Sequence, residues 1–106
     1  METILKQIPL ASVASILSAH YYALEISQKA GVAILEQISF ATRVSQYCAQ
    51  NNHTGDTLIF SLVKNDDVCI LKAYAESTQG PVLVEIPKHA AEAAISVLTG
   101  QSTNVS

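Results

Sequence analysis

The sequence predicts a small α+β domain with helices first, then a three-stranded antiparallel β-meander, then a C-terminal helix. Three observations predict this fold class. Apolar residues recur at helical spacing up to about residue 49, they alternate with the period of strands from 57 to 86, and a second helical pattern follows Pro87. At 106 residues the chain fits one domain with one modest core. We place this domain at residues 1–100 and a polar tail at 101–106.

The first half of the chain is predicted to be one long helix or a broken pair of helices, after a short helical turn at residues 1–7. Pro9 suits the first turn of the long helix, where its missing N–H costs nothing. The apolar stripe lapses at Lys29 and Gly31, a cation and a glycine typical of a helix end, so we favour a break there. An unbroken helix to residue 49 would be about 60 Å long and would need a partner chain to cover it. The stripe comprises Leu10, Val13, Leu17 and Leu24, and continues with Leu35, Ile38, Ala41, Val44 and Cys48.

Three short strands are predicted after a polar loop at residues 51–56. They are Thr57–Val63, Val68–Tyr74 and Val82–Ile86, separated by turns that contain Asn, Asp and Gly. Lys72 and Glu85 indicate which side of the second and third strands faces water. Pro87 then suits the first position of the C-terminal helix, whose apolar residues are Ala91, Ala94, Ile95 and Leu98.

The chain carries few charges, which favours self-association. Charged residues make up 14% of the sequence, against roughly 25% in an average domain, although a small domain has relatively more surface. The alternative is a weakly charged helical surface rich in Ala and Ser. The predicted sheet also has a second apolar face that needs a cover, and another sheet or an edge strand of a second chain would supply it. The residues expected at an oligomer interface are Leu17, Leu24, Ile59, Ser61 and Val63.

Charge and cysteine content argue against several classes of function. The six Lys and Arg residues are scattered and the net charge is −3, so we expect neither nucleic-acid binding nor an electrostatic membrane anchor. Two cysteines without close spacing are expected to be buried thiols in a reducing compartment. Since no long apolar run is present either, the predicted location is cytoplasmic.

The densest group of functional side chains is His20, Tyr21 and Tyr22, which the fold could complete with Tyr74. These four residues are the candidates for a ligand-binding site, although an amphipathic helix that buries one tyrosine explains the same pattern. No catalytic motif or glycine-rich phosphate loop is present, so no catalytic residue and no cofactor is predicted. No metal is predicted either, because no two of the residues that could form a zinc site have a metal-binding spacing. Those residues are Cys48, His53, Cys69 and His89.

Two functions are compatible with these patterns. The first is a small, non-enzymatic protein-interaction or regulatory protein that acts as a homo-oligomer and binds another protein. The second is a small-molecule sensor or small enzyme with a pocket between helices and sheet. The second function requires the four candidate residues to converge on one cavity.

Overall fold

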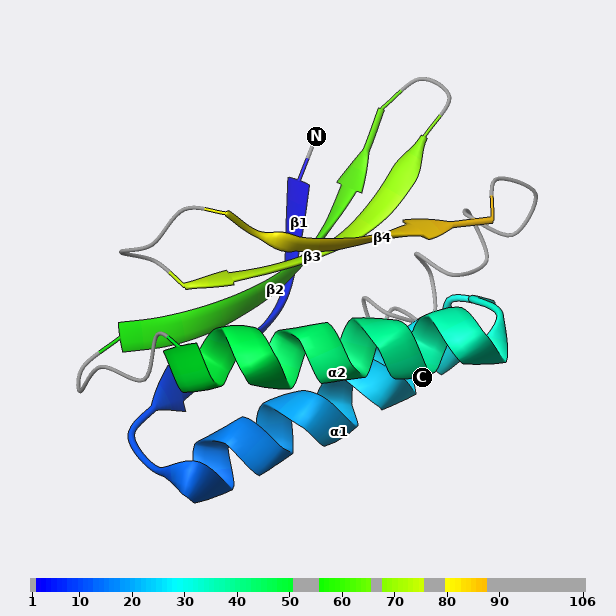
Figure 1. The fold of residues 1–106 in the computed structure, drawn as a ribbon. Coiled ribbons are helices and arrows are strands. Elements are labelled where there is room, and N and C mark those ends of the chain that lie inside the picture. The colour runs from blue at the N-terminus through cyan, green and yellow to red at the C-terminus, as the bar shows by residue number, and fades with distance from the viewer. Residues whose placement is uncertain (1, 51–55, 66–67, 76–79, 88–106) are drawn as a thin grey trace, which may run out of the picture.

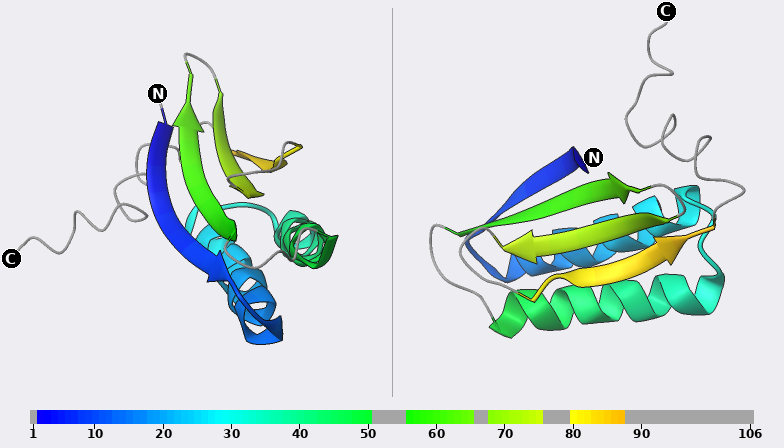
Figure 2. Two further views of the ribbon diagram at one scale, coloured as in Figure 1. Left: turned by 90° about the vertical axis from the view of Figure 1, so that its left-hand side faces the viewer. Right: turned by 90° about the horizontal axis from the view of Figure 1, so that it is seen from above.

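The chain folds into a layer of two helices against a four-stranded sheet. The computed structural model describes residues 2–50, 56–65, 68–75 and 80–87. In chain order, these residues form β1 (Glu2–Leu10), α1 (Val13–Lys29), α2 (Ile34–Gln50), β2 (Asp56–Lys64), β3 (Cys69–Ala75) and β4 (Val82–Ile86). The sheet is antiparallel with the strand order β1-β2-β3-β4, and both helices lie against the same face of it (Figures 1 and 2).

The predicted layout, with helices first and a three-stranded sheet, is wrong. The chain starts with a strand, because residues 2–10 pair with β2 and add a fourth strand at the edge of the sheet. Pro9 lies inside this strand rather than at a helix start. An edge strand tolerates proline, since the missing N–H can face away from the neighbouring strand. The short helical turn expected at residues 1–7 is likewise replaced by β1, as far as the described residues reach.

The predicted C-terminal helix lies outside the described residues, which end at Pro87. The same holds for the predicted tail. The three predicted strands are present as β2, β3 and β4, and their alternation is as expected. Each strand buries every second side chain against the helices, and in β1 this alternation begins after an irregularity between Ile4 and Lys6. The buried apolar residues of this face are Ile8, Leu10, Leu58, Phe60, Leu62, Cys69, Leu71, Ala73, Ala75, Val82, Val84 and Ile86.

The helix break expected near Gly31 is confirmed. The connection from α1 to α2 has the bonding of a Schellman motif, in which the Val32 N–H donates to the Ser27 carbonyl at 3.0 Å and the Gly31 N–H to the Gln28 carbonyl at 3.1 Å. This motif places its glycine in the left-handed region, and Gly31 has φ +79°. The chain therefore reverses in a few residues, and the two 17-residue helices run antiparallel.

Small side chains let the two helices approach each other closely. Ala19 and Ala23 on α1 and Ala41 on α2 are completely buried. Phe40 and Phe60 fill the space between the helices and the sheet, and both are completely buried as well. The small residues explain why several larger apolar side chains of the same helices are left on the outside.

Candidate functional site

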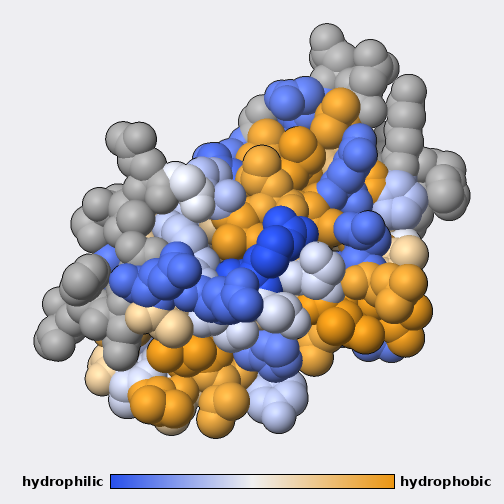
Figure 3. Space-filling model, viewed as in Figure 1, coloured by the Kyte–Doolittle hydropathy of each residue, from blue (hydrophilic) through white to orange (hydrophobic). Residues whose placement is uncertain are grey.

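The most conspicuous surface is the side of the helix pair that faces away from the sheet. Eight large apolar side chains are exposed among the described residues, and six of them belong to α1 and α2. Between 51% and 78% of each of these six is accessible. We call this surface the outer helix face, and its six residues are Val13, Leu17, Tyr21, Ile34, Leu35 and Ile38. Figure 3 shows apolar groups of this face along the lower edge of the molecule.

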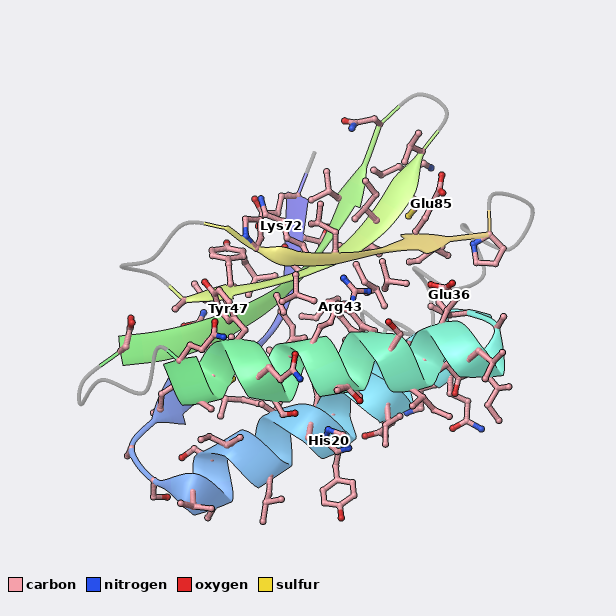
Figure 4. The ribbon with its side chains drawn as sticks, in the orientation of Figure 1. His20, Glu36, Arg43, Tyr47, Lys72 and Glu85 are labelled. Carbon is pink, nitrogen blue, oxygen red and sulfur yellow. The ribbon has the colours of Figure 1, made fainter. Side chains whose placement is uncertain are left out.

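The outer helix face is also poor in charge. The two helices together carry four charged residues, Glu25, Lys29, Glu36 and Arg43. Glu25 and Lys29 neutralise each other in an ion pair with a 3.1 Å separation. Figure 4 shows Glu36 and Arg43 on the flank of α2 that is turned toward β4, rather than on the side away from the sheet. No charged residue of either helix therefore separates the apolar residues of α1 from those of α2.

His20 lies where the two helices meet. Its Nδ1 is 3.1 Å from the carbonyl oxygen of Ala41, and because a carbonyl oxygen can only accept, Nδ1 carries the hydrogen. The imidazole also contacts the Tyr21 ring edge-on, with ring centroids 5.5 Å apart. Figure 4 shows His20 on the side of the helices away from the sheet. This residue therefore links the two helices and lies next to Tyr21 of the outer helix face.

A second candidate site is an open groove between the edge strand β1 and the helix α1. The groove has a volume of about 540 Å³, within the range of roughly 300–1,000 Å³ that is usual for ligand sites. We call it the β1–α1 groove. It is lined by Lys6, Gln7, Ile8 and Pro9 from the strand and by Ser18, Tyr21, Tyr22 and Glu25 from the helix.

Tyr22 anchors one wall of this groove. Its ring contacts the buried Phe60 ring edge-on, with centroids 4.8 Å apart, and the Lys6 Nζ lies 5.4 Å from the Tyr22 centroid. Partial burial, and secondarily the nearby charge of Glu25, raises the pKa of the Tyr22 hydroxyl. Tyr22 therefore keeps its proton at neutral pH and presents a neutral hydroxyl beside a cation.

The two charged residues that line the groove, Lys6 and Glu25, differ in whether they already have an ion-pair partner. Glu25 is bound to Lys29, as described above. Lys6, in contrast, has no ion pair with any of the described residues, and its Nζ lies over the face of the Tyr22 ring. The position of Lys6 depends on the irregularity in β1, after which Lys6 pairs with Phe60 on the helix side of the sheet. The groove thus contains one cation that is open to a negatively charged partner.

The structure separates the four predicted ligand-binding residues. Tyr21 and Tyr22 line the β1–α1 groove, whereas His20 lies between the helices. Tyr74 belongs to the opposite face of the sheet, where its hydroxyl donates to the Glu2 carboxylate at 2.9 Å and its ring lies 5.0 Å from the Lys72 Nζ. The four side chains therefore do not line a common cavity.

Glu2 and Tyr74 belong to a small polar cluster on that opposite face of the sheet. Interaction with the Ser61 hydroxyl, followed by the bond from Tyr74, lowers the pKa of Glu2. The Ser61 Oγ is close enough to the carboxylate to have this effect, but it lies outside hydrogen-bond geometry with any group of the described residues. The cluster ties the first residues of β1 to β3 across β2.

The predicted interface residues have different environments. Leu17 is exposed on the outer helix face, and Leu24 is half-buried against the core. Ile59 and Ser61 are already buried on the second face of the sheet, and Val63 is half-buried there. Only Leu17 is thus largely available for contact with another chain.

The described residues contain no group of three or more potential metal ligands. Cys48 and Cys69 are buried free thiols, and His53 and His89 lie outside the described part of the chain. Burial raises the pKa of Cys48 to about 11, and burial also raises the pKa of Cys69, with a smaller opposing effect of Lys64. None of the helices in the described ranges is long and apolar enough to cross a membrane.

Sequence reasoning missed the β1–α1 groove, because it placed no strand before α1. It also missed four residues of the outer helix face, namely Val13, Ile34, Leu35 and Ile38. The sequence does contain a signal for these exposed residues. A second stripe at helical spacing, made mostly of small residues, comprises Ala19, Ala23, Ile26 and Ala30. This stripe is the one that is buried.

Comparison with known proteins adds no functional information. No protein-family model matches the sequence. Searches of curated proteins and of solved structures gave no match either.

Proposed function

We propose that this chain is a non-enzymatic protein-interaction protein that acts as a homo-oligomer through its outer helix face. The observation that carries the proposal is the gathering of six exposed large apolar side chains on one side of α1 and α2. Exposed apolar surface of this kind is typical of protein–protein contacts. In a regulatory role, the assembled chain would then present its remaining surfaces to another protein.

The size of the apolar surface supports a second copy as the occupant. Burying a Leu or Ile side chain completely stabilises by about 1.5–3 kcal/mol, so a side chain that is half to three-quarters exposed represents on the order of 1 kcal/mol or more. Two copies would bury twelve such side chains, for a total of roughly 10–20 kcal/mol. This total can offset the roughly 4–15 kcal/mol that association costs. With a polar partner, only the six apolar side chains of this chain would be buried, and the apolar stabilisation would be about half as large.

The two edge strands of the described sheet, β1 and β4, are less suited to self-association. β4 has five residues and lies between Pro81 and Pro87, and β1 contains Pro9 and an irregularity after Ile4. Prolines and irregularities of this kind limit edge-to-edge pairing. An extended sheet across two chains is therefore a poorer solution than contact between helix pairs.

A comparison of matched variants tests the location of the contact. Leu17→Glu on α1 and Leu35→Glu on α2 each place a charge in the outer helix face, and both variants should elute from a sizing column as monomers. Leu83→Glu is the control, since Leu83 is an exposed apolar residue of β4 outside that face. Unchanged elution of the first two variants, with native circular dichroism, would refute the proposed contact.

A further inference from the structure

We propose that the edge of β1 that pairs with no other described strand, its free edge, binds an extended, acidic peptide segment of a partner protein, which lies along the β1–α1 groove as a fifth strand. This site shares one residue, Tyr21, with the outer helix face, but the main-chain groups that it uses belong to β1, and binding there does not require self-association. Strand addition of this kind uses main-chain hydrogen bonds for alignment and side-chain pockets for selectivity. The β1–α1 groove offers both.

The main-chain groups that a fifth strand needs can be assigned from Pro9. Because Pro9 has no N–H, it fits the ladder when its nitrogen faces away from β2. Thr57 is the residue of β2 that pairs with Pro9, and its N–H donates to the Asp56 carboxylate at 3.1 Å. This donor therefore has an acceptor other than the Pro9 carbonyl, as the orientation requires. Backbone direction alternates along a strand, so Gln7 also turns its N–H and C=O toward the free edge. An incoming strand can therefore form bonds with Gln7 and with the Pro9 carbonyl.

The groove lies directly beside these groups. Four consecutive residues of β1 line it, and the opposite wall is one flank of α1 with the spacing i, i+3, i+4 and i+7. Tyr22 is held in place there by Phe60. Every second side chain of an added strand would point toward this wall, where the volume of about 540 Å³ is sufficient for one or two side chains.

The charge of the groove indicates that the bound segment is acidic. Lys6 has no ion pair with the described residues, while Glu25 is already paired with Lys29. A carboxylate beside Lys6 would form a charge-assisted hydrogen bond. A basic segment would instead meet an unpaired cation, so we expect discrimination against it. The short open edge, bounded by Pro9 and by the irregularity after Ile4, suits a peptide better than a whole sheet.

The test begins with a displayed library of random twelve-residue peptides, from which those that bind the full chain are selected. The dissociation constants of labelled winning peptides are then measured by fluorescence anisotropy. We expect winners with an acidic residue among alternating apolar residues. We expect Lys6→Gln to weaken binding about tenfold or more, as for the loss of one charge-assisted bond. Arg43→Gln, which removes a cation of α2 outside the groove, should leave binding unchanged.

Gln7→Pro tests the strand pairing itself. This variant removes the outward N–H at a position where an edge strand accepts proline, and its folding is checked by circular dichroism. We expect it to weaken peptide binding about tenfold. Three results would overturn the proposal: no enriched peptide, binding that is insensitive to Lys6→Gln, or binding that is lost with Lys6→Gln but retained with Gln7→Pro. The last result would indicate a simple carboxylate site without an added strand.

Discussion

The Tyr47 hydroxyl on α2 accepts a hydrogen bond from the main-chain N–H of Ala75, the last residue of β3, at 2.9 Å. Tyr47 is buried and points from α2 toward the sheet (Figure 4). The bond occupies a buried main-chain donor that would otherwise lose its partner at the end of the strand. It fixes the end of β3 against the helix that carries part of the outer helix face.

We expect Tyr47→Phe to lower the free energy of unfolding by about 1–3 kcal/mol, because it leaves the Ala75 N–H buried without this acceptor. Urea unfolding followed by circular dichroism measures the change. Tyr21→Phe is the matched control, since Tyr21 is exposed on α1 and its stability effect should be close to zero. Equal stabilities of the two variants would show that the bond to Ala75 contributes nothing.

Glu2 should make the stability of the protein sensitive to acid. Its pKa in the folded chain is lower than the ordinary value of 4.5, because Ser61 and Tyr74 favour the carboxylate. A group with a lowered folded pKa contributes stability above its unfolded pKa and loses it as the pH falls through the folded value. The contribution is therefore complete above about pH 5 and is lost as the pH falls from the ordinary glutamate pKa through the lower pKa of the folded chain.

We accordingly predict that Glu2→Gln and Tyr74→Phe reduce the difference between the urea midpoints at about pH 6 and about pH 3. Glu85→Gln, at an exposed position of β4, is the control for a general charge effect. If Glu2→Gln and Glu85→Gln change the pH dependence equally, the contact with Tyr74 has no specific role.

Gly31 should resist substitution because of its backbone conformation. Its φ of +79° is unfavourable for a residue with a Cβ, at a cost of about 1–2 kcal/mol. We expect Gly31→Ala to lower the unfolding free energy by that amount, and Gly31→Asn to lower it less, because asparagine tolerates the left-handed region better. Thermal unfolding gives the comparison. A loss for alanine no greater than that for asparagine would contradict the proposed role of the turn.

The two thiols should be unreactive in the folded protein. Cys48 and Cys69 are buried, and the pKa of about 11 for Cys48 leaves on the order of one thousandth of it ionised at pH 8. We expect labelling by dithionitrobenzoate at pH 8 to be about a hundredfold slower in the native state than in urea. Rapid labelling without denaturant would mean that the core opens readily or that the thiols are accessible.

The sequence was informative where local pattern and tertiary environment agree. The β2–β4 meander follows from alternating apolar residues, and the helix break follows from Gly31. The first strand was not predictable from its pattern, because Pro9 suits a helix start and an edge strand equally well and only pairing with β2 decides between them. That strand forms one wall of the β1–α1 groove, so the groove could not be anticipated.

The outer helix face was only partly predictable for a related reason. Helical spacing identifies several apolar stripes on α1, but it does not say which one is buried. Close approach of α2 selects the small residues Ala19 and Ala23 for the core, which leaves Leu17 exposed. Large side chains on the outside are thus a consequence of helix–helix packing, and packing depends on residues that are distant in the sequence.

The mass of the protein in solution tests self-association through the outer helix face most directly. Sedimentation equilibrium over a range of micromolar concentrations should give a mass that is a multiple of 11.3 kDa, decreasing toward one chain on dilution. The Leu35→Glu variant should sediment as one chain throughout. A wild-type mass of one chain at every concentration, in a protein with native circular dichroism, would contradict the account.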